Sequence, residues 1–271
     1  MSLRINSNVD AMEAHRRLSA TSDKIAQSME RLSSGLRINK AADDAAGLGI
    51  SEKMRGQING LAQAQRNIQD GVSMVQTAEG NLDEVHSILQ RVRELAVEYK
   101  NGSLSQSGRA AIQSEINQLA SEVDRIGSSA QFNGISLLDG TAGGGGAVTF
   151  QIGANDSDVL AISFPSLAAR LSATNWSSLQ TATLSNIDAA IDAVTSLRSE
   201  LGATQNRLEH ALSVTAVYQE NLTAAESRIR DVDMADEMVT LTKNQILQQA
   251  GTAMLAQANQ APQSVLNLLR Q

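Results

Sequence analysis

Residues 61–99 read LAQAQRNIQDGVSMVQTAEGNLDEVHSILQRVRELAVEY, and this stretch decides the fold. Apolar and small residues recur along it at alternating spacings of three and four. This is the heptad pattern of a helix that packs along another helix. The positions are Leu61, Ala64, Ile68, Gly71, Val75, Ala78, Leu82, Val85, Leu89, Val92, Ala96 and Tyr99. The stretch therefore predicts one long helix that needs a long partner.

A matching seam lies in the other half of the chain. It comprises Ile187, Ala190, Val194, Leu197, Leu201, Thr204, Leu208, Ala211, Thr215, Tyr218, Leu222, Ala225, Ile229 and Val232. Two long seams separated by a turn-rich middle can bury each other only if the chain folds back on itself. We therefore predict a mainly α fold: a long antiparallel helical bundle or coiled coil made by the paired N- and C-terminal halves, with a small β-hairpin region in the middle.

The remaining patterns place the other elements. A first helix carries Ile5, Val9, Met12, Leu18, Ile25, Met29, Leu32 and Leu36, and it ends near residues 33–35. A small-residue connector over residues 37–49 follows, with Gly47 and Gly49 predicted to break the helix. The predicted helices are residues 51–100, 105–127 and 184–229, and, after a break near residues 231–233, a last helix carrying Leu247, Ala250, Met254, Ala258, Ala261, Val265 and Leu268.

The middle of the chain changes period. Turn signals at residues 132–140 and four consecutive glycines at residues 143–146 precede two alternating segments, residues 148–152 and 159–164. Alternation of this kind, bounded by turn residues, predicts a β-hairpin. We expect this hairpin and turn region to occupy residues 133–178.

Composition excludes several function classes. The net charge is −7, with 22 Lys and Arg against 29 Asp and Glu, which argues against a nucleic-acid surface because phosphate binding needs clustered cations. There is no cysteine, so disulfides and thiolate chemistry are absent. Residues 1–17 lack the apolar core and cleavage site of a signal peptide, so an extracellular role would require a dedicated export machine.

The two ends of the chain are rich in Ala, Ser and Gln, and we expect them to bury too little apolar surface to fold alone. Residues of about 1–45 and 232–271 are therefore predicted to gain their order from neighbouring copies.

Blocks of sequence at both ends and in between make the chain resemble bacterial flagellins. They are residues 5–8 (INSN), 30–38 (ERLSSGLRI), 43–47 (DDAAG), 90–97 (QRVRELAV), 131–134 (QFNG), 226–229 (ESRI), 245–259 (QILQQAGTAMLAQAN) and 265–270 (VLNLLR). The resemblance covers nearly the whole chain. Only about 45 residues, 133–178, stand where large flagellins insert outer domains, so the chain looks like a minimal flagellin.

The resemblance implies an inner coiled-coil domain of residues 1–45 and 230–271 and an outer rod domain of residues 46–229. It implies no enzymatic activity and no cofactor, but a structural subunit that self-assembles into a helical filament for motility. Residues expected to act in inner-domain assembly are Ile5, Val9, Leu32, Leu36, Leu247, Met254, Val265 and Leu268. A hook–filament junction protein and a host-interaction or adhesion protein stay open as alternatives.

The same resemblance implies a location and partners. The subunit would be secreted through the flagellar type III system, without a cleaved signal peptide, into the extracellular flagellum. Its partners would be copies of itself, an export chaperone at the C-terminal helix, the filament cap and the hook-associated junction proteins. The C-terminal helix is amphipathic, but it is poor in Lys, Arg and aromatic residues, so we expect a coiled coil rather than a membrane surface.

A specific patch follows from the QRVRELAV block. By resemblance, Gln90, Arg91 and Leu95, with Glu115 on the adjacent helix, form a subunit contact that Toll-like receptor 5 of vertebrate hosts recognises. The heptad register puts Leu95 outside the seam, which predicts an exposed leucine.

Other candidate sites have weaker patterns. Asp43 and Asp44 form a carboxylate pair, but no histidine adjoins them, so a polar connector is the simpler interpretation. The histidines His15, His86 and His210 are far apart and match no metal-binding motif. Possible O-glycosylation sites in the exposed middle are Ser157, Thr174 and Ser177.

Overall fold

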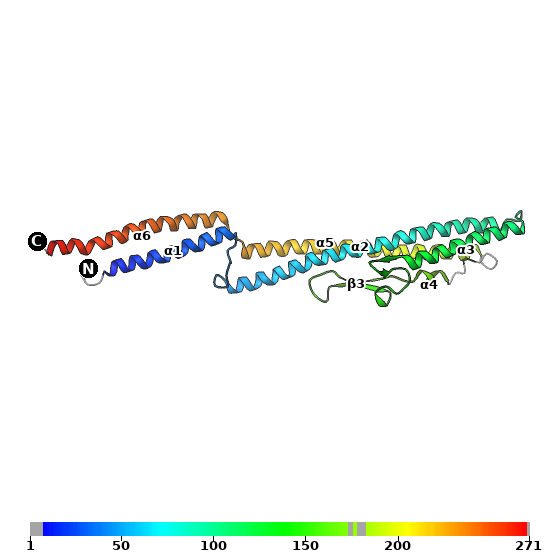
Figure 1. Ribbon diagram of the computed structural model, residues 1–271, viewed down its shortest axis with the longest axis horizontal. Coiled ribbons are helices and arrows are strands. Elements are labelled where there is room, and N and C mark those ends of the chain that lie inside the picture. Colours follow the sequence, from blue (N-terminus) through cyan, green and yellow to red (C-terminus); the bar gives the residue numbers. More distant parts are fainter. Residues whose placement is uncertain (1–7, 173–175, 178–182, 270–271) are drawn as a thin grey trace. The chain divides into compact units, whose positions relative to one another are not determined.

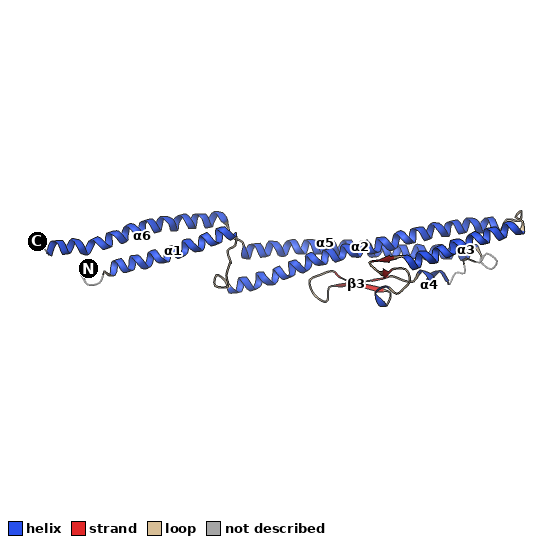
Figure 2. Cartoon of the chain, viewed as in Figure 1, coloured by secondary structure: helices blue, strands red, loops and turns tan. Residues whose placement is uncertain are grey.

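A computed structural model of the chain describes residues 8–172, 176–177 and 183–269, with the backbone alone for residues 261–269. Its helices are α1 (Val9–Ser34), α2 (Ala45–Tyr99), α3 (Gln106–Ser129), α4 (Leu167–Ser172), α5 (Leu184–Arg230) and α6 (Met234–Leu269). Its strands are β1 (Gln131–Phe132), β2 (Ile135–Ser136), β3 (Ala147–Gln151) and β4 (Val159–Ser163), with a 3-10 turn η1 (Ala142–Gly144). The mainly helical fold with a small hairpin region in the middle is confirmed (Figure 2).

The chain folds into two compact units. One comprises Gln57–Asn221, and the other comprises the described parts of Met1–Gly56 and Leu222–Gln271. We call them the central unit and the terminal unit. Helices α2 and α5 contribute residues to both.

In the central unit α2 and α5 pair as the two seams predict. The α2 seam is buried from Leu61 to Ala96, and Ile187, Val194 and Leu208 of α5 are fully buried opposite it. Polar side chains cross between the helices in antiparallel order: Gln65 Nε2 donates to Gln219 Oε1 at 2.7 Å, and Arg93 Nε contacts Asp188 Oδ1 at 2.6 Å. The seam prediction is therefore confirmed for this unit, except that Tyr218 is exposed.

A second buried row runs along α2 beside the seam. Met74, Ile88 and Leu95 each precede a seam residue by one position and are at most 7% exposed. They belong to the same core as Ile112, Ile116, Val123 and Ile126 of α3. Helix α2 therefore buries two faces rather than one.

The small strands rest on this helical core. In β1–β2, Phe132 pairs with Ile135 across a two-residue turn in which Asn133 and Gly134 both have positive φ, the pattern of an Asn-Gly hairpin. In β3–β4, Ala147 pairs with Ser163 and Gln151 with Val159. Asn67 Nδ2 of α2 donates to Gln151 O at 3.2 Å, so the second hairpin is tied to the long helix.

In the terminal unit α1 and α6 run side by side in opposite directions, so the first turn of α1 lies beside the C-terminal part of α6 (Figure 1). Asn8 caps α1 because its Oδ1 accepts from Ala11 N at 3.0 Å, and Gly35, at φ 72°, ends the helix. The helices therefore pair within a single chain. Whether this pairing persists without neighbouring copies stays a prediction.

The connector between α1 and α2 corrects one expectation. Gly47 and Gly49 were predicted to break the helix, but both lie inside α2, which begins at Ala45. Asp44 Oδ1 accepts from Gly47 N at 2.8 Å and so satisfies a free amide of the first turn. A Cβ atom on Gly47 would lie 2.8 Å from Ile38 Cδ1. Gly47 is therefore present because a side chain would not fit, and not because the helix stops.

Candidate functional site

The seam between α1 and α6 is polar for a coiled coil. Asn8 Nδ2 donates to Ala258 O at 2.9 Å at one end, and Arg31 Nη1 lies 3.6 Å from Glu237 Oε2 at the other. The side chains that α6 shields in this seam recur at heptad spacing: Glu237, Leu241, Asn244, Gln248, Gly251, Leu255 and Ala258. Opposite them α1 shields Ala11, Ala14, Leu18, Thr21, Ile25, Ser28 and Leu32. Few of these residues are large and apolar.

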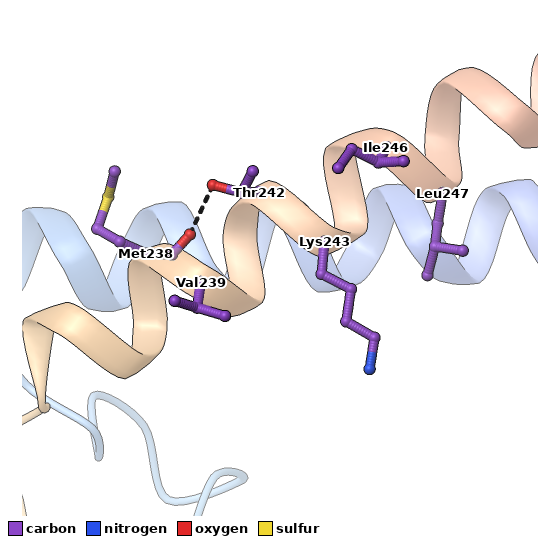
Figure 3. A pocket seen from close by; sticks show the side chains of 6 residues that line it. All are labelled: Met238, Val239, Thr242, Lys243, Ile246 and Leu247. Carbon is purple, nitrogen blue, oxygen red and sulfur yellow. Dashed lines mark hydrogen bonds between the residues drawn. The ribbon is translucent and has the colours of Figure 1, made fainter.

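The outer face of α6 is the more apolar one. Five large apolar side chains on this face are 48–67% exposed: Met238, Val239, Ile246, Leu247 and Met254. Six neighbouring side chains line one open surface: Met238, Val239, Thr242, Lys243, Ile246 and Leu247. Figure 3 shows them in two rows, with Met238, Thr242 and Ile246 on one edge and Val239, Lys243 and Leu247 on the other. We call this surface the α6 apolar face.

The predicted inner-domain residues divide between the seam and the outer surface. Leu32 and Leu36 are half-buried, whereas Val9 is 61% exposed and Leu247 and Met254 belong to the exposed set. Ile5 lies outside the described residues, and Val265 and Leu268 are described as helix backbone alone.

The apolar pattern of the last helix does not coincide with the intrachain seam. Leu247, Ala250 and Met254 are exposed, and among the residues with described side chains only Ala258 of that pattern lies in the intrachain seam. The difference has a physical cause: the pattern follows the most apolar line on α6, but α1 packs on a more polar line beside it. The role of Leu247, Ala250 and Met254 in assembly between subunits stays a prediction. Met238, Val239 and Ile246 were missed altogether. Their signal was present, because the apolar side chains of residues 234–250 cover most of the helix surface and leave one polar face with Glu237 and Asn244, whereas a helix on the surface of a globular protein has only one apolar stripe.

The predicted patch on α2 and α3 assembles in part. Arg91 Nη1 lies 3.1 Å from Glu94 Oε2, and its Nη2 lies 3.1 Å from Glu115 Oε1 of α3. The hydrogen bonds that Arg91 donates to the carboxylates of Glu94 and Glu115 raise the pKa of its guanidinium above the ordinary value. Gln90 is exposed, and its Nε2 lies 2.9 Å from His86 Nε2. Gln90, Arg91 and Glu115 therefore form a polar patch in which Gln90 and Arg91 are exposed and Glu115 is half-buried.

Leu95 does not belong to that surface. It was predicted to be exposed, but it is only 2% exposed and lies in the second buried row of α2. The prediction considered one partner helix, whereas α2 also packs into the core that α3 shares. Leu95 is therefore a residue of the core and not of the exposed surface.

The carboxylate pair in the connector is structural. Asp43 Oδ2 accepts from the amides of Lys40 and Asn39 at 2.9 and 3.1 Å, and these hydrogen bonds lower the pKa of Asp43. Asp44 caps α2 as described above. Both side chains therefore hold the connector in place, as the simpler interpretation expected.

No group of three potential metal ligands occurs among the described residues, and none of their helices is long and apolar enough to cross a membrane. Of the predicted glycosylation sites, Ser157 is exposed in the turn between β3 and β4. Ser177 is half-buried beside the buried Trp176, and Thr174 lies outside the described residues.

A helical pair with polar residues inside and apolar residues outside defines a class of protein, the self-assembling structural subunit, because the apolar face calls for further copies or partners. Comparisons with known proteins give the family. The family model for the bacterial flagellin N-terminal helical region matches residues 5–143, and the model for the bacterial flagellin C-terminal helical region matches residues 184–269. The chain belongs to the bacterial flagellin family.

Individual relatives match this chain in sequence along nearly its whole length. A flagellin of Halalkalibacterium halodurans is 52% identical, with 98% of this chain and 99% of the relative covered. Flagellin of Bacillus subtilis is 47% identical over 99% of this chain and 100% of the relative. The crystal structure of Bacillus cereus flagellin superposes with a TM-score of 0.50 at 30% identity, covering 55% of this chain and 88% of that one.

A putative flagellar hook-associated protein from Vibrio parahaemolyticus has a TM-score of 0.57 at only 14% identity, so it shares the fold alone. These findings make the chain a structural subunit of the flagellar filament, which is an extracellular, self-polymerising assembly, and not an enzyme. They do not favour a hook–filament junction protein or an adhesion protein.

Proposed function

We propose that subunits of this filament join through the outer surface of the terminal helices, with the α6 apolar face as its centre. The observation that carries this proposal is the inverted polarity of the α1–α6 pair. Glu237 and Asn244 are buried inside it, while Ile246 and Leu247 are 60% and 48% exposed outside it. This surface would belong to an inner domain of residues 1–45 and 230–271, with residues 46–229 as the outer rod.

Burial supplies the driving force. Each Val, Leu, Ile or Met side chain removed from water contributes about 1.5–3 kcal/mol. Several such side chains per subunit would outweigh the entropy lost on docking when the contact is repeated along a filament. Lys243 lies at the edge of the face. A wrongly aligned contact would bury its charge without water or an acidic partner, which is unfavourable, so Lys243 disfavours non-specific association of free subunits.

Polymerisation tests this proposal directly. We expect the double variant Ile246→Ser with Leu247→Ser to raise the critical concentration for filament growth at least about tenfold. The reason is that the favourable free energy of burying these two apolar side chains is lost. Val159→Ser on β4 is the matched control, because Val159 is 51% exposed but lies outside the terminal helices. Sedimentation and electron microscopy give the readout, with circular dichroism as the check on helix content. Normal filaments from the double variant would overturn the proposal.

The polar patch of Gln90, Arg91 and Glu115, together with the buried Leu95, is proposed as a second subunit contact and as the surface that Toll-like receptor 5 recognises. Support comes from the geometry of Arg91, which joins α2 to α3 and so presents a rigid charged surface. Arg91→Ala should weaken both filament growth and binding to the receptor ectodomain. Arg125→Ala is the control, since Arg125 forms an exposed pair with Glu122 on the same helix as Glu115. Equal effects of the two variants would contradict this part of the proposal.

The α6 apolar face would need cover before assembly. We propose that an export chaperone binds it in the cytoplasm and that the subunit leaves through the flagellar type III system. In the finished filament the end subunits would contact the cap and the hook-associated junction proteins. Copurification of a small protein partner with wild-type chain, but not with the Ile246→Ser, Leu247→Ser variant, tests the chaperone contact. Of the two proposed O-glycan acceptors that the structure describes, Ser157 is more exposed than Ser177.

A further inference from the structure

The methionines are unevenly distributed. The chain has eight, and Met74 lies in the core of the central unit at 2% exposure, while Met54 is half-buried in α2. All the described methionines that are strongly exposed lie on the terminal helices: Met12, Met29, Met234, Met238 and Met254. Their exposure ranges from 49% to 69%.

This placement exposes sulfur where the proposed assembly surface lies. Met238 is part of the α6 apolar face, four residues before Thr242, whose hydroxyl donates to the Met238 carbonyl at 2.8 Å (Figure 3). Met254 lies two turns beyond Leu247 on the same helix and is 66% exposed. A thioether adapts its shape to a neighbouring surface, which suits a contact between copies. It is also the apolar group that peroxides oxidise.

We propose that these exposed methionines are modification sites, and that their oxidation by hydrogen peroxide prevents a free subunit from polymerising. This inference rests on the proposed assembly surface. In the reaction the sulfur lone pair attacks one oxygen of the peroxide and the O–O bond breaks. A sulfur–oxygen bond forms, the thioether is oxidised to the sulfoxide, and the peroxide is reduced to water.

The sulfoxide acts on assembly through polarity. Its oxygen is a hydrogen-bond acceptor, and moving such a group from water into an apolar contact without a donor is unfavourable. The α6 apolar face would then carry one polar oxygen at Met238, and Met254 would carry another farther along the same helix. Once the contact has formed, the same sulfurs are shielded, so an assembled filament resists peroxide. Methionine sulfoxide reductases reverse the modification, which makes the block reversible.

Each molecule contains its own reference, because Met74 is buried in the central unit in both states. Free subunits are treated with hydrogen peroxide, and sulfoxide formation at each methionine is followed by peptide mass spectrometry. We expect Met12, Met238 and Met254 to oxidise at least about tenfold faster than Met74, in line with the access that each sulfur has. Equal rates at exposed and buried sites would overturn the inference.

Assembly of the treated protein is the second readout. We expect oxidised subunits to show a critical concentration raised about tenfold, and treatment with both reductases to restore it. The matched variant carries Leu at positions 12, 29, 234, 238 and 254, a change that keeps volume and apolarity. It should polymerise normally and stay insensitive to peroxide.

Two outcomes separate this inference from the proposal on which it rests. If subunits oxidised at these positions polymerise like untreated ones, or if peroxide blocks the five-leucine variant equally, the oxidation inference is wrong while the assembly surface stands. If the Ile246→Ser, Leu247→Ser variant polymerises normally, the surface itself is wrong. Reductase rescue requires no variant, so the test does not depend on how well the five-leucine chain folds.

Discussion

Arg31 of α1 and Glu237 of α6 face each other in the seam of the terminal helices, with Nη1 and Oε2 3.6 Å apart. Their side chains are 27% and 11% exposed, and Arg31 Nε is buried without a hydrogen-bond partner among the described residues. A shielded ion pair of this kind adds little net stability, because desolvation offsets attraction. Its value lies in register, since no other alignment of the two helices pairs these charges.

The first prediction concerns this pair. Glu237→Leu alone should weaken the α1–α6 pairing by about 1–3 kcal/mol, because it leaves the Arg31 charge shielded and unpaired. The double variant Arg31→Met with Glu237→Leu should recover or exceed wild-type pairing. Amide hydrogen exchange of α6 in assembled filaments measures both, because the terminal helices are predicted to gain their order from neighbouring copies. Slower exchange in the single variant than in the double variant would contradict the expected order.

The second prediction concerns Leu95, which is 2% exposed in the second buried row of α2. Leu95→Ala should lower the free energy of unfolding by about 2–5 kcal/mol, because it removes apolar contacts and leaves a cavity. Urea unfolding of the monomer, followed by circular dichroism, measures this loss. Arg91→Ala, four residues earlier on the exposed side, should change stability by less than about 0.5 kcal/mol. Similar values for the two variants would show that Leu95 carries no core packing.

The sequence was sufficient for the three long helices of the central unit, α2, α3 and α5, but not for the short α4, which lies in the region predicted as hairpin and turns. Along α2 every predicted seam position from Leu61 to Ala96 is buried, because a heptad repeat and its partner repeat in α5 admit one arrangement. The Asn133–Gly134 turn was equally readable, since both residues favour positive φ. These features depend on local pattern and on one partner at a time.

Two of the differences between sequence and structure arise because a helix has more than one partner. Leu95 was misplaced because a seam describes one neighbouring helix, and α2 has two buried faces. On α6 the apolar pattern at Leu247 and Met254 points outward, while α1 covers Glu237 and Asn244. A helix with apolar residues on several faces does not reveal which face is buried within the chain and which between chains. That choice depends on the assembly, which no single sequence pattern encodes.

The third prediction uses two glycines in the first turns of α2. Gly47→Ala should destabilise the terminal unit by about 1–3 kcal/mol, because the new Cβ would lie 2.8 Å from Ile38 Cδ1 and would also clash with Asp44. Gly49→Ala is the matched variant: no atom lies within 4 Å of its Cβ position, and alanine favours the helix by about 0.5–1 kcal/mol. Thermal unfolding should shift in opposite directions for the two variants. Stabilisation by both would mean that the connector adjusts freely.

The fourth prediction concerns acid sensitivity of the connector. Hydrogen bonds from the amides of Lys40 and Asn39 lower the pKa of Asp43 in the folded chain. A carboxyl group whose pKa is lowered by folding adds stability above its unfolded pKa of about 3.9, and this stability is lost as the pH falls through the lower folded value. We therefore expect the loop of residues 37–44 to open in free subunits below about pH 4.

Nuclear magnetic resonance of the Asn39 and Lys40 amides across this pH range follows the opening, since both donate to Asp43 Oδ2. Asp43→Asn keeps the shape of the side chain but removes its titration, so the opening below about pH 4 should be absent from the Asn39 and Lys40 amide shifts of this variant. Asp156→Asn, in the β3–β4 turn, removes the same charge elsewhere and should leave the wild-type transition in place. If the Asp43→Asn chain opened at the same pH as wild type, protonation of another group would govern the connector, because the amide side chain of this variant does not titrate in this range.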